Sequence, residues 1–226
     1  MPLRQVPITA GITPELTAAI NRTISPERWR TYLYAGGFSQ DRALRIYLWN
    51  AAIGQSFHFP LQAVEVSLRN VIHAALTAQY SANWCFDNGC RGMLGRKLEA
   101  DLDKAQQRYE NIYNRAPTTT QLLASLSLGF WVTLLRRPYR TALWSAHAVN
   151  AFPNLGVGED MTDVSKRGTA IQDLRNRIFH QEALIGHNLS QDYADILVML
   201  GWICSTTREW VRQHSSVPKV IRERPR

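Results

Sequence analysis

Three side chains near the end of a predicted helix have the chemistry for acid–base work: Arg175, Asn176 and His180. Histidine titrates near neutral pH, so it can donate or accept a proton during a reaction. Arginine stays protonated, and its planar guanidinium can clamp and stabilise phosphate oxygens. An asparagine one helical turn before the histidine can hold the imidazole ring or touch the substrate. The three residue types therefore suit a reaction at a phosphate, with His180 as acid or base, Arg175 as stabilising cation and Asn176 as positioning group.

The helix that must position them is predicted over about 163–184. At ~100° per residue, its apolar residues fall on one stripe that faces a core. Asn176 and His180 lie one turn apart on nearly the opposite side, and Arg175 stands at the border between the two faces. The alternative interpretation is an ordinary solvated polar face with a chance histidine.

Residues 175–180 resemble the Arg-x4-His signature of the HEPN superfamily, including its frequent polar residue after the arginine. Residues 64–70 (VEVSLRN) and 126–131 (LSLGFW) are similar to two further segments of its Abi-like, or abortive infection, branch. The similarity extends over 26–210. It implies a helical bundle and a metal-independent endoribonuclease, without a cofactor, that cleaves tRNA or mRNA in phage defence. It also implies a homodimer with a composite active site, restrained by an antitoxin or a phage-derived trigger.

The chemistry of RNA cleavage agrees with these residue types. Without a metal, the ribose 2′-hydroxyl attacks the adjacent phosphate and the 5′-oxygen leaves. The reaction needs a base, an acid and positive charge on the phosphate. A single His180 supplies only half of the acid–base pair, and the sequence places no other histidine near it. A two-fold dimer would bring two histidines and two arginines into one cleft.

Glu65 and Arg69 lie one turn apart within the first of the similar segments. One interpretation is an intrahelical ion pair, which stabilises a helix by a few tenths of a kcal/mol. The functional interpretation places both residues near the motif helix, where they hold Arg175 or line the cleft.

Further basic residues are candidates for gripping RNA. Arg136, Arg137 and Arg140 form a cluster that could also be a solvated helix end favoured by the helix dipole. Lys166 and Arg167 precede the motif and could extend the same track, and Arg177 lies inside it.

Composition favours a globular protein with a polyanionic partner. The 226 residues are 45% hydrophobic and 19% charged, with a net charge of +8. Arginine accounts for most of the basic residues and suits bidentate phosphate contacts, although a compositional bias of the genome could also produce it. No apolar run reaches the ~18 residues of a transmembrane helix, and the first residues lack the apolar core of a signal peptide. We therefore expect a cytoplasmic protein without membrane association.

The cysteines do not indicate a metal site. Cys85, Cys90 and Cys204 are odd in number and contain no CxxC pair. This pattern argues against a disulfide framework and against zinc.

Periodicity predicts an all-α bundle of roughly eight helices. Residues 1–24 form a loose arm over 1–10 followed by a short helix, 25–214 form the Abi-like helical domain, and 215–226 form a basic tail that is expected to be mobile from 219 onward. Pro60 is expected to end one helix and begin another. Residues 119–136 and 190–214 are each expected to form one helix.

A second class of function is consistent with the same sequence. The chain could keep the bundle without the activity, as an RNA-binding or phage-sensing regulatory protein. Tight RNA binding without cleavage would favour the RNA-binding protein. Absence of salt-dependent RNA binding would favour the phage-sensing protein.

Overall fold

The computed structural model describes residues 13–225, and within them every regular element is helical. The α-helices are α1 (Pro14–Ile24), α2 (Pro26–Ala35), α3 (Gln40–Gln79), α4 (Asn88–Tyr113), α5 (Thr119–Ser125), α6 (Leu128–Leu134), α7 (Ser145–Ala151), α8 (Met161–Phe179), α9 (Leu189–Ile203), α10 (Ser205–His214) and α11 (Val217–Arg222). The predicted all-α class is confirmed. The estimate of eight helices was too low for the described residues, because two predicted helices are divided and the predicted tail contains another. The arm predicted over 1–10 lies outside the described residues.

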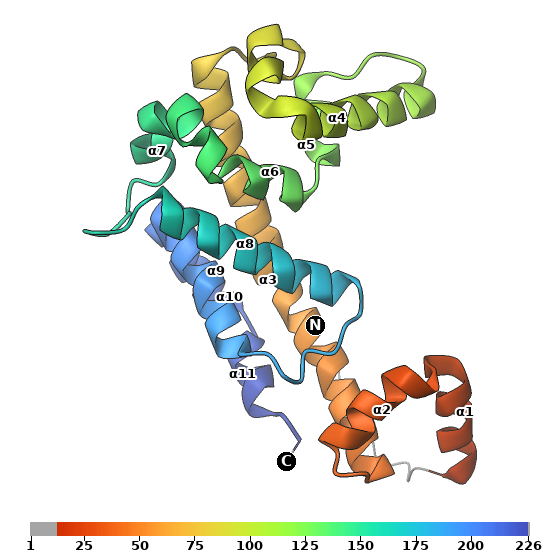
Figure 1. Cartoon of the computed structure of the whole chain (residues 1–226). Coiled ribbons are helices and arrows are strands. Elements are labelled where there is room, and N and C mark those ends of the chain that lie inside the picture. Colours follow the sequence, from red (N-terminus) through yellow and green to blue (C-terminus); the bar gives the residue numbers. More distant parts are fainter. Residues whose placement is uncertain (1–12, 226) are drawn as a thin grey trace.

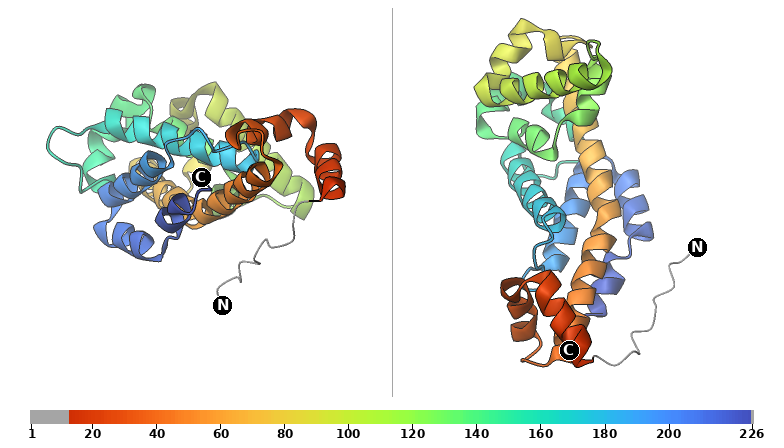
Figure 2. Two further views of the ribbon diagram at one scale, coloured as in Figure 1. Left: turned by 90° about the horizontal axis from the view of Figure 1, so that it is seen from below. Right: turned by 90° about the vertical axis from the view of Figure 1, so that its right-hand side faces the viewer.

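Helix α3 runs the length of the molecule, and α2, α6, α7, α8, α9, α10 and α11 pack along it (Figure 1; Figure 2). The predicted break at Pro60 is wrong, since α3 continues through this proline. A proline inside a helix costs about 3 kcal/mol. Ile53 and Phe57 before it and Leu61 after it are buried in the core. Each such side chain contributes about 1.5–3 kcal/mol by burial, so packing on both sides of Pro60 offsets the cost of continuing the helix.

The chain builds two hydrophobic cores of unequal size along α3. The large core lies among α3, α6, α8 and α9. The small one joins Trp29 and Tyr32 of α2 to Ala43 and Ile46 at the start of α3. The loop that follows α8 also packs on the small core through its residues 183 and 185. The C-terminal end of α8 therefore lies where the two cores meet.

Two long predicted helices are each divided by a residue with extended backbone. Between α5 and α6, Leu126 adopts φ −79° and ψ 137°, and Ser127 caps the second helix. Between α9 and α10, Cys204 adopts φ −159° and ψ 113°. Apolar periodicity does not reveal such breaks, because the pieces on either side bury residues in the same core.

The predicted mobile tail contains a packed helix. Val217 of α11 is buried, and Trp49 of α3 donates a hydrogen bond from Nε1 to the carbonyl oxygen of Val220 at 2.8 Å. The interpretation of the tail as mobile is therefore wrong for 219–222. None of the helices in residues 13–225 is long and apolar enough to span a bilayer.

The turn between α2 and α3 provides a stability test. A Cβ at Gly36 would lie 2.8 Å from the backbone nitrogen of Ala43, so the two helices would have to separate. We expect Gly36→Ala to lower the free energy of unfolding by about 1–3 kcal/mol in urea denaturation. Gly92→Ala is the matched control, because its Cβ meets nothing within 4 Å inside α4. That change should stabilise by about 0.5–1 kcal/mol. Equal effects would show that the turn is not tightly packed.

Candidate active site

The motif helix α8 begins at Met161 with a capping box, two residues before the predicted start at about 163. Asp160 is the N-cap, and its Oδ1 accepts a hydrogen bond from the Thr162 N–H at 2.6 Å. Asp163 accepts in return from the Asp160 N–H at 3.1 Å. Hydrogen bonds from Thr162 lower the pKa of Asp160 below its ordinary value. The two carboxylates satisfy N–H groups that the first turn of a helix leaves free.

The same helix ends at Phe179 and does not continue to residue 184 as predicted. His180 is the C-cap, and its N–H donates to the carbonyl oxygen of Asn176 at 2.8 Å. Gln181 follows with φ 59°, and the N–H of Glu182 donates back to the carbonyl oxygen of Arg177 at 2.9 Å. This is a Schellman motif, in which a left-handed residue closes the last turn. His180 therefore stands at the exposed end of the helix.

Arg175 is held between helices α8 and α3. Its Nε lies 3.9 Å from Oε2 of Glu65, and its guanidinium carbon lies 4.2 Å from the centre of the Phe179 ring. This Nε is buried and makes no hydrogen bond within residues 13–225. The predicted proximity of Glu65 to the motif helix is confirmed. The alternative pair with Arg69 does not form among the described residues, although Arg69 lies on the same helix one turn further on.

The other segments that carry the HEPN resemblance also meet α8. Helix α6 packs against both α3 and α8. At Gly129 of α6, an added Cβ would lie 3.0 Å from Nε2 of Gln172, so the absence of a side chain lets the two helices approach closely. Phe130 and Trp131 are buried beside it. The three similar segments thus form one packed unit.

A cavity of about 360 Å³ opens beside the motif end. Its walls come from α2, from α3 and from 178–184. Asn50 of α3 holds segment 178–184 in place, because its Oδ1 accepts a hydrogen bond from the Leu184 N–H at 2.7 Å. Phe179 and Gln181, the neighbours of His180 in the chain, both line the cavity. The sequence did not indicate this cavity, because it forms between elements more than a hundred residues apart.

The predicted basic track divides into separate environments. Arg140 donates a hydrogen bond to Oγ1 of Thr162 at 2.7 Å, so it lies at the opposite end of α8 from Arg175. Thirteen residues of helix separate these ends by roughly 20 Å. Arg136 and Arg137 are exposed at the end of α6. The structure therefore does not bring this cluster together with the motif.

Two further basic residues are engaged with neighbours. Arg167 forms an ion pair with Asp195 of α9, and its guanidinium carbon lies 5.2 Å from the centre of the Trp202 ring. Arg177 pairs with Glu182 at 2.8 Å. These contacts fasten α8 to its surroundings, and Lys166, which precedes Arg167, is exposed. A role of any of the three in binding RNA stays a prediction.

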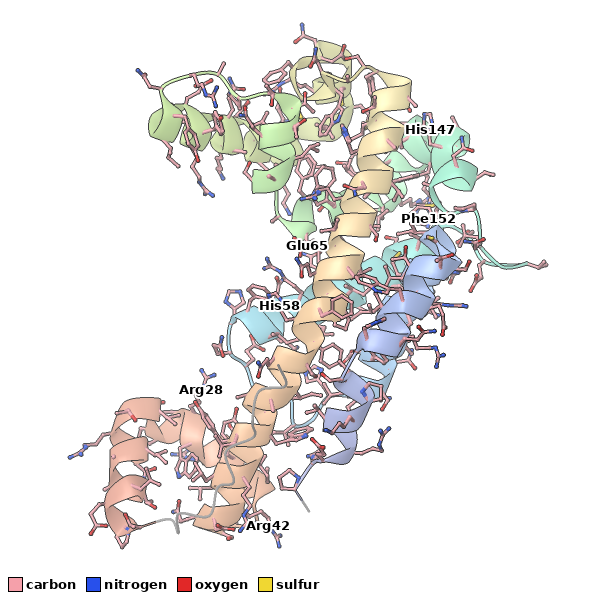
Figure 3. All side chains as sticks on the ribbon, turned by 180° about the vertical axis from the view of Figure 1, so that it is seen from behind. Arg28, Arg42, His58, Glu65, His147 and Phe152 are labelled. Carbon is pink, nitrogen blue, oxygen red and sulfur yellow. The ribbon has the colours of Figure 1, made fainter. Side chains whose placement is uncertain are left out.

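One histidine near the motif escaped the sequence reasoning. His58 of α3 is exposed and lines the cavity together with Phe179. Glu65 lies seven residues further along α3, which places the two side chains on nearly the same side of the helix. Figure 3 shows both projecting from this side of α3. Helical periodicity places His58 and Glu65 on one side of α3, but only the fold shows that this side faces α8.

His73 has a structural environment instead. Its Nδ1 accepts a hydrogen bond from Nε1 of the buried Trp84 at 2.9 Å, which requires the neutral imidazole. Burial lowers the pKa of His73 below its ordinary value of 6.5, and the neighbouring Arg69 lowers it further.

Two of the three cysteines, Cys85 and Cys90, have no reactive environment. Cys85 and Cys90 are buried, and burial raises the pKa of each thiol to about 12. No group of three or more histidine, cysteine or acidic side chains in the described part of the chain could hold a metal ion.

No family model, curated protein or solved structure matches this chain. The HEPN assignment is therefore a hypothesis that rests on the motif residues and their placement.

The environment of His73 predicts a pH dependence of stability. Because the folded state disfavours its protonation, the unfolded chain binds more protons as the pH falls below about 6.5. The unfolding free energy should therefore decrease from pH 7.5 to pH 5.5, as measured by urea denaturation. In His73→Gln, an amide oxygen can still accept from Trp84 but does not titrate, so the decrease should be smaller. Equal decreases in both proteins would contradict this role.

Proposed function

We propose that the chain is a metal-independent endoribonuclease of an Abi-like HEPN type. The observation that carries the proposal is the end of α8, where Arg175 is held by Glu65 and Phe179 and the exposed His180 follows directly. Cleavage at a phosphate needs a guanidinium that stabilises charge and an imidazole that exchanges protons, and this helix end carries both side chains. The net charge of +8 suits an RNA substrate such as tRNA or mRNA.

The reaction follows from the roles of these side chains. The ribose 2′-oxygen loses its proton to a base and forms a bond to the adjacent phosphorus. The bond from phosphorus to the 5′-oxygen breaks, and an acid protonates the leaving oxygen. Arg175 stabilises the charge on the pentacoordinate phosphate. The products carry a 2′,3′-cyclic phosphate and a 5′-hydroxyl, and Asn176 positions the imidazole of His180 or the substrate.

The second acid–base group would come from the partner in a homodimer. Two exposed helix ends that face each other would bring two His180 side chains to one phosphate. His58 is the alternative within one protomer, because it lines the same cavity as Phe179.

In the cell, we propose a cytoplasmic role in phage defence, as an abortive infection protein or as the toxin of a toxin–antitoxin pair. An antitoxin or a phage-derived trigger would control the exposed site. The alternative is a non-catalytic RNA-binding or phage-sensing regulatory protein with the same fold.

The direct test is cleavage of total RNA and purified tRNA in excess EDTA. Wild type should cleave and leave 2′,3′-cyclic phosphate ends. His180→Ala should reduce the rate by about 10²–10⁴-fold, which is the usual contribution of a general acid or base. Arg175→Ala should reduce it by about 10²–10³-fold, through loss of transition-state charge stabilisation.

His147→Ala is the matched control. His147 lies on α7, near the other end of α3 from Arg42 (Figure 3), and should leave the rate unchanged. Persistent cleavage by an Arg175→Ala, His180→Ala double variant would refute this site. RNA binding without cleavage by any variant would favour the regulatory alternative.

The composite site predicts that inactive subunits inhibit active ones. Increasing amounts of His180→Ala are incubated with a fixed amount of wild type, so that subunits exchange. RNA is kept in large excess, so that the inactive subunits do not sequester it. Because each mixed dimer lacks one imidazole, the rate should fall well below that of wild type alone. An unchanged rate would place the whole site within one protomer, and His58→Ala should then abolish cleavage.

A further inference from the structure

We propose that the cavity between α2, α3 and residues 178–184 binds a nucleobase, that of the nucleotide flanking the scissile phosphate. This inference deepens the proposed nuclease function and rests on it for the identity of the substrate. The position of the cavity, its lining and the turn at its edge each support it.

The cavity adjoins the motif through Phe179. The guanidinium carbon of Arg175 lies 4.2 Å from the centre of this ring. Phe179 is nevertheless 52% exposed, and it also lines the cavity. A base that stacks against Phe179 from the cavity would therefore contact the same ring as Arg175. Its own sugar and phosphate would then extend toward Arg175 and His180, so the cavity and the motif would hold adjacent parts of one nucleotide.

The lining matches the chemistry of a base in single-stranded RNA. Tyr47 and Phe179 supply aromatic surface, and Ala51 and Gly54 supply a small apolar wall on α3. Proteins recognise unpaired bases by stacking them on aromatic rings and by hydrogen bonding to their edges. The volume of about 360 Å³ lies in the range of small-molecule sites.

Amide side chains in the lining can read the edge of a base. Gln55 of α3 and Gln181 of the turn both line the cavity, and each side-chain amide offers a donor and an acceptor. Such amides pair with the donor and acceptor edges of bases, adenine above all. Arg28 of α2 is also in the lining, on the side of α3 that carries His58 (Figure 3), and it can contact a neighbouring phosphate. Glu182 is already paired with Arg177 at 2.8 Å, which reduces its repulsion of an anion.

The backbone at Gln181 adds an independent observation. Its φ of 59° is a left-handed conformation that glycine adopts without strain and glutamine does not. A glutamine is nevertheless present where its side chain lines the cavity. Gln181→Gly therefore removes the amide and relaxes the turn at the same time, so a loss of function could not be attributed to unfolding.

The test couples the cavity to one base of the substrate. Ala51→Leu fills the cavity from α3 with a residue of high helix propensity, and Ala100→Leu is the matched control on an exposed position of α4. The cleaved bond of an RNA oligonucleotide is mapped first, and oligonucleotides with an abasic nucleotide on either side of that bond are then compared. In wild type and Ala100→Leu, one of the two abasic substitutions should lower kcat/KM by about 5- to 100-fold, the usual value of one stacked base.

Ala51→Leu should lower kcat/KM for the intact oligonucleotide by a similar factor and should be insensitive to the abasic substitution. Gln181→Gly should change the preference among the four bases at that position without lowering the free energy of unfolding. Cleavage with the same abasic effect in wild type and Ala51→Leu would overturn the base site and leave the nuclease intact.

Calorimetric titration with the four nucleoside monophosphates separates the remaining outcomes. If no RNA is cleaved but a monophosphate binds to wild type and not to Ala51→Leu, the nuclease function fails and the cavity is a site for a free nucleotide. If no RNA is cleaved and no monophosphate binds, both proposals are overturned.

Discussion

The continuity of helix α3 through Pro60 is the constraint on which the candidate site depends. Were the helix to end there, His58 before the proline and Glu65 after it would have no fixed relation. Because the helix continues, the two residues lie on nearly the same side, roughly 10 Å apart along the axis. That side faces the end of α8, where Glu65 lies beside Arg175 and His58 lines the neighbouring cavity. Burial of apolar residues on both sides of Pro60 maintains this arrangement.

The division into two cores explains why the cavity lies where it does. The large core fixes α8 against α3, α6 and α9, while the small core fixes α2 against the start of α3. The loop after α8 bridges them, with residues 183 and 185 on the small core and Leu184 bonded to Asn50. A junction between two separately packed units leaves space that neither fills, and the motif helix ends at this junction. The site is thus open to a ligand without any loss of packing in either core.

The sequence was informative where the signal was local and uninformative where it was spatial. The apolar stripe of α8 was predicted, because periodicity depends on neighbouring residues. The continuation through Pro60 was missed, because its cost is offset by core contacts that no local pattern reveals. Glu65 was placed beside Arg175 through a family resemblance, whereas His58, far from the motif in the chain, had no such signal.

The end of α8 carries a local conflict that folding alone does not explain. The Schellman turn needs a left-handed residue at 181, and glycine would satisfy it without strain. A glutamine there costs on the order of 1 kcal/mol, and the residue is exposed and lines the cavity. Beside it, Arg175 keeps a buried Nε without a hydrogen-bond partner in the described residues. Strain and an unsatisfied donor tend to occur together at sites shaped for a ligand. Both lie within six residues of His180, so the local cost of this helix end is concentrated where a substrate would be bound.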